Sequence, residues 1–316
     1  MRILITDCAS LTSGGDLSLE PLKKYGEITE YGNISREELL KEVVNKDIVL
    51  CNKTVIDSEV INAAPNLKYI GVFATGYNNI DITLAKQRGI AVCNAGSYST
   101  NAVAQQVIAY ILLHYTNIPR YNEFVKEGGW KRSPVFSPLV FPADEVAGKT
   151  LGIIGYGNIG KAVERAAAGL NMNVLVYTRT VRENGATRFT DFDTLLKNSD
   201  IITLHCPLNK QSENMMNEEA FSKCKRGAFF INTSRGGTVD ETALLNALKS
   251  GRLSGAAIDV LKEEPMSEDC VLADAPNIII TPHTAWAPLS TRRRLLSITC
   301  ENIDSFLNGK IKNRIV

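Results

Sequence analysis

The chain has 316 residues, 44% of them hydrophobic, and carries 35 Lys and Arg against 34 Asp and Glu. The length suits two ordinary domains, and the near-zero net charge excludes the broad basic field that attracts nucleic acid or an anionic membrane. Seven scattered cysteines and the lack of an apolar run near 18 residues argue against a disulfide framework and a membrane span. We therefore expect a cytoplasmic protein with reduced thiols and no metal site.

Short β-branched runs alternate with helical patterns over residues 1–97. Runs at 3–5, 48–50 and 69–73 predict strands. Ser35 and Glu38 have the spacing of a capping box that opens a helix, and Asp81 and Gly89 bracket another helix. This alternation predicts a βαβ arrangement.

A cleaner alternating set follows Gly148, and its near-continuous apolar strands are typical of a parallel sheet covered on both faces. Residues 101–120 predict one long helix, and a helix after Pro288 has an apolar stripe whose partner is either domain. Residues 133–142 are expected to form an irregular arm. The second set of strands is predicted at residues 151–154, 174–177, 201–204, 228–231, 256–258 and 278–280.

The motif Gly155-x-Gly157-x-x-Gly160, which includes Asn158 and Ile159, ends the first of these strands and opens a helix predicted at residues 161–170. Glycines at this spacing permit a tight turn and let backbone N–H groups approach a pyrophosphate, whose charge a helix N-terminus favours. Because the motif stands between a strand and a helix, it predicts a dinucleotide site.

The end of the second strand of this set should carry the residue that reads the ribose of the dinucleotide. An acid there would bind the 2′-hydroxyl of NAD, but the sequence has Thr178 and Arg179, with Arg182 beyond. Since an arginine can hold a 2′-phosphate, the interpretation is a preference for NADPH over NADH. The alternative is a solvated basic loop that leaves NADH binding intact.

The later strands of this set each end in residues that can bind a ligand or transfer a proton, at the edge where open α/β sheets bind ligands. A structural role is the alternative for each residue. His205 would cap a strand and Arg235 would make a salt bridge, whereas Asp259 would cap a helix and His283 would be a core histidine. Glu264 and its neighbour Glu263 are alternatively just solvated. The residues at these ends are His205, Pro207, Thr233, Arg235, Asp259, Glu264 and His283.

Three of these residues together suit the reduction of a ketone. Hydride transfer leaves an alkoxide, and histidine is the side chain best suited to donate a proton near neutral pH, which indicates His283 as the acid. A carboxylate on its other ring nitrogen, for which Glu264 is the candidate, would favour the protonated ring. Arg235 is placed to bind a substrate carboxylate.

The first domain offers one matching feature at Ala74, Thr75 and Gly76, which follow an apolar strand. Their backbone N–H groups are candidates to face a small anion. The alternative is a plain strand-to-helix turn with Asp81 as the helix N-cap.

The chain resembles the D-isomer-specific 2-hydroxyacid dehydrogenases over essentially its whole length. The resemblance is carried by "ATGYNNID", "GIIGYGNIG", "HCPL", "INTSRGGTVDETAL", "AAIDVLKEEP" and "TPHTAWA", in the family's order. It implies that Arg235 binds the substrate carboxylate and that Glu264 pairs with the acid/base His283. It further implies that Asp259 holds the nicotinamide carboxamide and that Thr233 lines the cofactor cleft.

The resemblance also implies an α/β fold with two Rossmann-like domains, each with a doubly wound parallel sheet, and an active site in the interdomain cleft. Residues 1–97 plus 288–316 would form the substrate domain and residues 98–287 the dinucleotide-binding domain. Family members are usually homodimers with an arm like residues 115–145. Trp286 in "HTAWA" makes the chain similar to the hydroxypyruvate and glyoxylate reductase branch of the family. Its side chain would narrow the pocket around a small 2-oxo acid.

Two features limit the resemblance, and two other functions compete. Thr178 replaces an acid common in NAD-preferring members, and Gln105 stands where many relatives have glutamate. A D-lactate dehydrogenase, or another D-2-hydroxyacid dehydrogenase, is an alternative within the family. A cofactor-sensing binding protein that resembles the carboxy-terminal corepressors is an alternative of another class, although the chain lacks their long disordered extensions.

Overall fold

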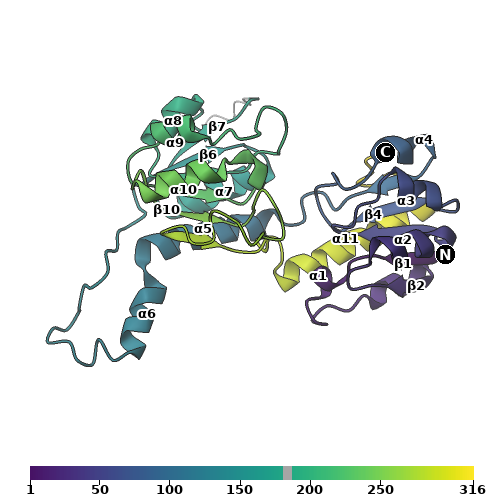
Figure 1. Ribbon diagram of the computed structural model, residues 1–316, viewed down its shortest axis with the longest axis horizontal. Helices are drawn as coiled ribbons and strands as arrows, with labels where there is room; N and C mark the ends of the chain where they lie inside the picture. Colours follow the sequence, from purple (N-terminus) through teal and green to yellow (C-terminus); the bar gives the residue numbers. More distant parts are fainter. Residues whose placement is uncertain (181–186) are drawn as a thin grey trace. The chain divides into compact units, whose positions relative to one another are not determined.

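The computed structural model describes residues 1–180 and 187–316, and it divides into two compact units. The first unit is Met1–Ser99 with Trp286–Val316, and the second is Thr100–Ala285. Each unit is a parallel sheet flanked by helices, which is the predicted fold class (Figure 1). The contact-based boundaries lie at Ser99 and Trp286, so Trp286 falls in the first unit.

The first unit has a five-stranded sheet in the order β2-β1-β3-β4-β5, with every neighbouring pair parallel. The three predicted strands are β1, β3 and β4. Two strands were not predicted from the sequence: β2, an edge strand with only partly buried side chains, and the three-residue β5. The strands are β1 (Arg2–Ile5), β2 (Glu27–Glu30), β3 (Ile48–Cys51), β4 (Tyr69–Val72) and β5 (Ala91–Cys93).

Helices cover both faces of this sheet. The long α11 packs its buried Leu295, Leu296 and Ile303 on one face, so its partner is the first unit. The Ser35–Glu38 capping box is present at the start of α2, and Asp81 caps α4. The helices are α1 (Ala9–Thr12), η1 (Glu20–Tyr25), α2 (Arg36–Glu42), η2 (Val43–Asn45), α3 (Ser58–Ala63), α4 (Ile82–Gln87) and α11 (Leu289–Leu307).

The second unit has a six-stranded parallel sheet in the order β11-β10-β9-β8-β6-β7. All six strands were predicted from their apolar runs. The chain leaves β6 for β7 on one side and returns to β8 on the other, so the strand order reverses at β6. The strands are β6 (Thr150–Ile154), β7 (Asn173–Tyr177), β8 (Ile201–Leu204), β9 (Ala228–Asn232), β10 (Leu253–Ile258) and β11 (Ile278–Ile280).

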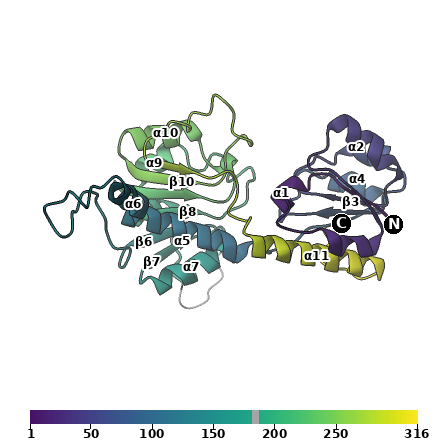
Figure 2. The same cartoon turned by 90° about the horizontal axis from the view of Figure 1, so that it is seen from below.

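Two hydrophobic cores enclose this sheet. Figure 2 shows α5 and α7 on one face and α9 and α10 on the other. Alternate strand residues serve opposite faces: Ile153 packs with α5 and α7, whereas Ile154 packs on the other side. The helices are α5 (Thr100–Thr116), α6 (Ile118–Lys126), α7 (Asn158–Gly169), α8 (Phe192–Asn198), α9 (Glu218–Lys223), η3 (Gly236–Thr238) and α10 (Glu241–Lys249).

The single helix predicted over residues 101–120 is wrong, because the structure breaks it at Asn117. Asn117 has φ 51°, in the left-handed region, where a helix cannot continue. Pro119 then lies in the first turn of α6, a position where its missing N–H costs nothing. Residues 133–142 are irregular, as expected.

Two further expectations concern side-chain chemistry and hydropathy. All seven cysteines are free thiols, as predicted. Among residues 1–180 and 187–316, no helix combines the length and the apolar character needed to cross a bilayer.

Candidate active site

The glycine motif forms a tight strand-to-helix turn at the reversal of strand order. Gly155 has φ 96°, and a Cβ there would stand 2.6 Å from the backbone nitrogen of Cys206. A Cβ on Gly160 would stand 2.4 Å from the carbonyl oxygen of Gly155. Both glycines are therefore fixed by close backbone packing.

Gly157 differs from Gly155 and Gly160 because a Cβ placed on it would meet no neighbouring atom. It is the N-cap of the twelve-residue α7, and no described atom lies within 4 Å of the position a Cβ would take. Asn158 and Ile159 form the first turn of this helix, whose leading N–H groups have no partners within the helix. This arrangement suits a pyrophosphate, which needs close backbone approach and a helix N-terminus.

Two buried polar atoms at the same edge of the sheet have no partner among the described residues. They are Nδ1 of His205, just after β8, and Oγ1 of Thr233, just after β9. His205 Nε2 lies 3.0 Å from the Thr203 hydroxyl, and burial lowers the pKa of His205 to about 3. Since unpaired buried polar atoms are costly, a ligand with its own donors and acceptors fits this edge.

The loop after β7 carries the residues predicted to read the ribose. The Nη1 atom of Arg179 donates to Oε1 of Gln211 at 2.7 Å, so Arg179 bridges to the segment after β8. In that segment, the carbonyl of Pro207 accepts from the Ser212 hydroxyl. Thr178 is half-buried at the end of β7. Arg182 lies outside the described residues.

Arg235 lies on a loop that Asn232 organises. The Asn232 side chain accepts from the backbone N–H of Ser234 at 3.0 Å and donates to the carbonyl of Arg235 at 3.0 Å. The exposed guanidinium of Arg235 donates to the Ser234 carbonyl at 2.7 Å and forms no ion pair with any described residue. The salt-bridge alternative therefore does not hold, and the guanidinium is open to an anion.

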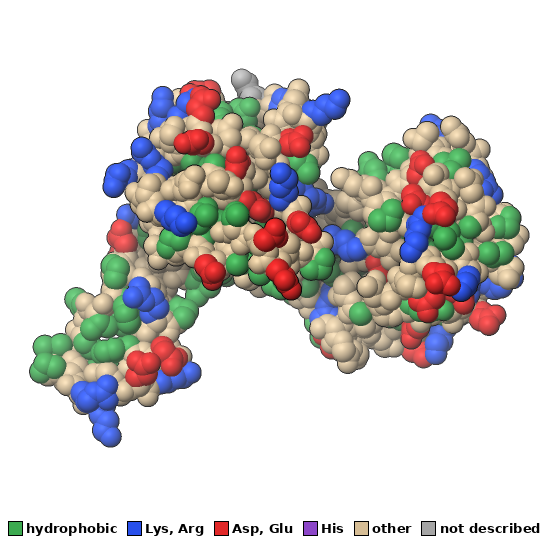
Figure 3. Space-filling model, viewed as in Figure 1, with side chains coloured by type: hydrophobic (Ala, Val, Ile, Leu, Met, Phe, Trp, Pro, Cys, Tyr) green, Lys and Arg blue, Asp and Glu red, His purple; other side chains and the backbone are tan. Residues whose placement is uncertain are grey.

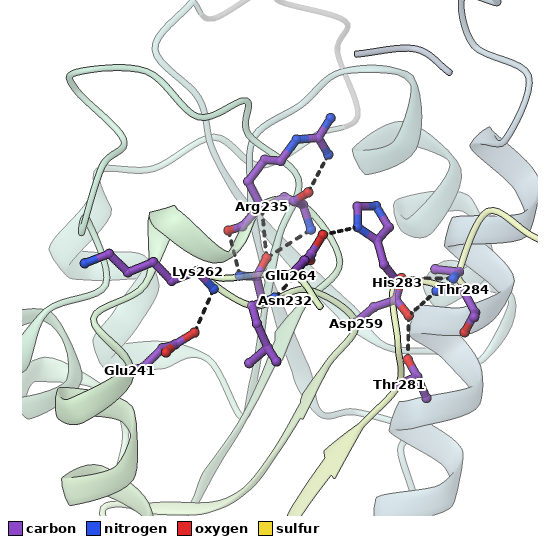
Figure 4. Close-up of polar contacts among 12 residues, drawn as sticks. Asn232, Arg235, Glu241, Asp259, Lys262, Glu264, Thr281, His283 and Thr284 are labelled. Atoms are coloured by element: carbon purple, nitrogen blue, oxygen red, sulfur yellow. Dashed lines mark hydrogen bonds and ion pairs between the residues drawn. The ribbon is translucent and has the colours of Figure 1, made fainter. Parts of the chain in front are cut away.

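Glu264 and His283 are in contact, although 19 positions separate them in the chain. Oε2 of Glu264 lies 2.7 Å from Nδ1 of His283, and Oε1 accepts from the backbone N–H of Leu261 at 3.0 Å. Figure 4 shows Arg235, Glu264 and His283 gathered at the carboxyl edge of the sheet. Glu263 is exposed, as its alternative predicted.

Asp259 holds the loop that carries His283. Its buried carboxylate accepts from the backbone N–H groups of Thr284, at 2.8 Å, and Ala285, at 2.9 Å, and from the hydroxyl of Thr281. Burial raises the pKa of the Asp259 carboxyl, although these hydrogen bonds act in the opposite direction. No helix follows Asp259, so the helix-cap alternative is wrong. Its contact with a nicotinamide stays a prediction.

The three histidines differ in their surroundings. His114 stacks on Phe229 with ring centroids 4.0 Å apart, and burial lowers its pKa. His205 is likewise kept neutral at pH 7 by burial. His283 has φ 53° and is the one of the three with a carboxylate as its partner. This geometry favours His283 as the proton-transfer residue.

The predicted residues of the first unit lie on its own loops. The Thr75 hydroxyl donates to the Gly96 carbonyl, and the Ala74 carbonyl accepts from Ala95 N–H at 2.9 Å. Gly76 lies in the turn that leads to Asp81, so the strand-to-helix alternative also describes this segment. Trp286 packs on the core of the first unit, edge-on to Tyr98. Substrate contacts of these residues stay predictions.

Comparisons with known proteins identify the family of the chain. The model of the D-isomer specific 2-hydroxyacid dehydrogenase NAD binding domain matches residues 108–285, more than half of the chain. The chain belongs to the D-isomer-specific 2-hydroxyacid dehydrogenase family. As a member of this family it is an NAD(P)-dependent oxidoreductase with two Rossmann-like domains.

Three similar proteins illustrate the range of the family. The chain is 40% identical over 319 residues to a hydroxypyruvate reductase of Blautia hydrogenotrophica, covering 99% of each chain. It is 37% identical to a glyoxylate reductase of Thermofilum pendens, covering 89% of this chain and 84% of that one. A solved acyclic imino acid reductase, in complex with NADPH and D-Arg, is 30% identical with a TM-score of 0.86 and complete coverage of both chains.

Several residues that hold the loops of this dehydrogenase's candidate site were not predicted from the sequence. Asn232, Thr281, Gln211 and Glu241 each bond to a loop that carries a predicted site residue. Asn232 had a signal, because it is a polar residue at the end of an apolar strand. The others act across long sequence separations, which no local pattern reveals.

Gly157→Ala should weaken cofactor binding without unfolding the enzyme. The added methyl meets no described protein atom, yet it stands where the pyrophosphate would approach the backbone. We expect the dissociation constant for NADPH or NADH, measured by fluorescence titration, to rise by about tenfold or more, as lost phosphate contacts of roughly 1.5 kcal/mol imply.

Gly169→Ala is the matched control, because Gly169 ends the same helix and is equally free of neighbours within 4 Å. It should leave the dissociation constant unchanged. Equal effects of the two substitutions would mean that the cofactor does not approach α7 at Gly157.

Proposed function

We propose that the enzyme uses NADPH or NADH to reduce a small 2-oxo acid, hydroxypyruvate or glyoxylate, to the hydroxy acid, which is the D-isomer for hydroxypyruvate. The observation that carries this proposal is the 2.7 Å contact between His283 Nδ1 and Glu264 Oε2, beside the guanidinium of Arg235, which forms no ion pair with a described residue. Similarity to proteins named hydroxypyruvate reductase and glyoxylate reductase supports the choice of substrate.

A bound nicotinamide supplies the hydride that adds to the carbonyl carbon. With Nδ1 bonded to Glu264, Nε2 of His283 is the ring nitrogen left to donate a proton to the carbonyl oxygen, which becomes the hydroxyl. The carboxylate of Glu264 fixes the orientation of the imidazole ring through its contact with Nδ1. The guanidinium of Arg235 binds the substrate carboxylate through two parallel N–H donors.

The residues of the cofactor edge fit the dinucleotide in the same proposal. Gly155, Gly157 and Gly160 would admit the pyrophosphate, and Thr233 and His205 would pair their buried polar atoms with the cofactor. Asp259 would act at the nicotinamide carboxamide, as the family resemblance implies. Trp286, with Ala74, Thr75 and Gly76, would limit the substrate to a short acid.

A panel of substrates separates the alternatives. Cofactor oxidation should be fastest with hydroxypyruvate or glyoxylate, whereas a preference for pyruvate would indicate a D-lactate dehydrogenase. The absence of turnover on every 2-oxo acid, together with capture of a peptide partner, would favour the corepressor-like binding protein. Reduction of 2-imino acids alone would place the chain with its imino acid reductase neighbour.

Substitutions in the trio should separate chemistry from binding. His283→Ala removes the proton donor and should lower kcat by about 10² to 10⁴, the usual size of general acid catalysis, while cofactor affinity stays unchanged. Arg235→Gln should chiefly raise KM for the 2-oxo acid, because it removes a charge-assisted contact.

Lys262→Ala is the control for charge, since Figure 4 shows the Lys262 side chain directed away from Arg235 and His283. Steady-state kinetics and cofactor titration measure all three variants. Retention of wild-type turnover by His283→Ala would contradict the proposed mechanism.

We propose that NADPH is the preferred cofactor, on the basis of Thr178 and Arg179 after β7. Arg179→Ala should lower kcat/KM for NADPH by at least about tenfold relative to NADH, because a charged hydrogen bond contributes roughly 1.5 to 3 kcal/mol. Arg226→Ala removes the same charge just before β9, at the opposite end of the sheet, and should leave the ratio unchanged. If Arg179→Ala leaves the ratio of kcat/KM for NADPH to that for NADH unaltered, the loop after β7 is solvated and does not select the cofactor.

We also propose that the enzyme is a homodimer in which residues 115–145 form an arm over a second copy. Figure 3 shows hydrophobic side chains along this arm. Phe136 is 89% exposed and Leu139 is 88% exposed, which is unusual for large apolar residues in a monomer.

The double substitution Phe136→Asp and Leu139→Asp should convert the dimer to a monomer in analytical ultracentrifugation, because it charges the arm. Ile311→Asp is the control, since Ile311 is 79% exposed and belongs to the first unit, not to the arm. A wild-type monomer, or a dimer that survives the double substitution, would contradict this assignment.

A further inference from the structure

The peptide that joins Leu261 to Lys262 packs closely against the loop that carries Arg235. A Cβ on Gly236 would stand 1.9 Å from the carbonyl carbon of Leu261 and 2.3 Å from the nitrogen of Lys262. Gly236 directly follows Arg235, so the substrate-binding loop and the loop of Glu264 are in backbone contact at this point. The spacing between Arg235 and Glu264 therefore depends on where this peptide lies.

A second group holds the same peptide from another direction. The backbone N–H of Lys262 donates to Oε1 of Glu241 at 2.8 Å. Glu241 is the first residue of α10, whose start is fixed by Asp240, since the Asp240 side chain accepts from Ala243 N–H at 3.0 Å. Figure 4 shows Glu241 and Lys262 joined in this way beside the trio.

Two successive backbone N–H groups thus donate hydrogen bonds to two different carboxylates. The N–H of Leu261 donates to Glu264 at 3.0 Å, and the N–H of Lys262 donates to Glu241 at 2.8 Å. Rotation of the Leu261–Lys262 peptide would break the bond from Lys262 N–H, whereas the bond from Leu261 N–H belongs to the preceding peptide, so the two bonds together fix two adjacent peptide planes. Glu264 in turn contacts His283 through its other oxygen.

We infer that Glu241 is a positioning residue for proton transfer: it pins the Leu261–Lys262 peptide and thereby holds Glu264 against His283 at a fixed distance from Arg235. This inference rests on the proposed function, because it assigns His283 the proton. Within the described part of the chain, Glu241 forms no hydrogen bond or ion pair with any of the three side chains, and its carboxylate binds Lys262 N–H instead. Its effect on the reaction passes through the loop geometry, to which catalysis is sensitive at the level of about 1 Å.

The bond between Lys262 N–H and Glu241 is accessible to solvent. Water can therefore satisfy the Lys262 N–H when Glu241 is removed, and the stability of the fold should change little. The loop should nevertheless lose its fixed position. This separates a positioning role from a purely structural one, which would lower the melting temperature together with the rate.

The test compares Glu241→Ala with Glu241→Gln, whose amide oxygen still accepts from Lys262 N–H. Glu241→Ala should lower kcat by about tenfold or more with cofactor affinity and melting temperature near wild type. Glu241→Gln should restore kcat to within about twofold of wild type, since the acceptor is kept. Glu263→Ala is the control, because Glu263 lies in the same loop and is exposed.

A double-substitution cycle shows whether Glu241 acts through Glu264. If it does, Glu241→Ala combined with Glu264→Ala should be no slower than Glu264→Ala alone. Additive losses would overturn the inference, as would wild-type kcat in Glu241→Ala or failure of Glu241→Gln to restore the rate.

A measurement without substrate keeps this test separate from that of the proposed function. A crystal structure of Glu241→Ala without substrate shows directly whether the loop moves. The distance between Nδ1 of His283 and Oε2 of Glu264 is 2.7 Å in the wild type and should lengthen by about 1 Å in Glu241→Ala, whereas Glu241→Gln should keep it. An unchanged distance in Glu241→Ala would reject the role of Glu241 whether or not a 2-oxo acid is reduced. A lengthened distance in an enzyme that reduces no 2-oxo acid would reject the proposed function alone.

Discussion

The account depends on the contact between Nδ1 of His283 and Oε2 of Glu264, which are 2.7 Å apart. The two residues come from different loops, and each loop is fixed by other groups. Asp259 binds the loop of His283 through Thr281, Thr284 and Ala285, and Leu261 N–H holds the second oxygen of Glu264. The contact therefore depends on several loops that meet at the carboxyl edge of the sheet.

The parallel sheet explains why this edge collects polar groups. Buried strands such as β8, β9 and β10 end together, so the residues that follow them share one edge. Burial at this edge disfavours the charged form of two groups and so shifts their pKa values in opposite directions. It lowers the pKa of His205 and raises the pKa of the Asp259 carboxyl. Close packing of Gly155 and Gly236 brings neighbouring loops into backbone contact. The fold thus places the glycine motif and the His283–Glu264 pair within one unit.

The sequence predicted the strands of the second unit and the residues at their ends, because apolar runs and the glycine motif are local signals. It did not predict the break at Asn117, which depends on a single left-handed residue, or the edge strand β2. It also missed Asn232 and Glu241, which act by bonding to distant backbone. Nothing in the sequence indicated that the Asp259 carboxylate binds the loop of His283, while its contact with a nicotinamide stays a prediction.

The most direct test is a crystal structure of the enzyme with NADPH and oxamate, an unreactive analogue of a 2-oxo acid. The account predicts that the oxamate carboxylate lies on the guanidinium of Arg235 and that its amide oxygen lies about 2.6 to 3.2 Å from Nε2 of His283. Glu264 should remain on Nδ1. Oxamate bound away from Arg235, or an imidazole turned from the analogue, would contradict the account.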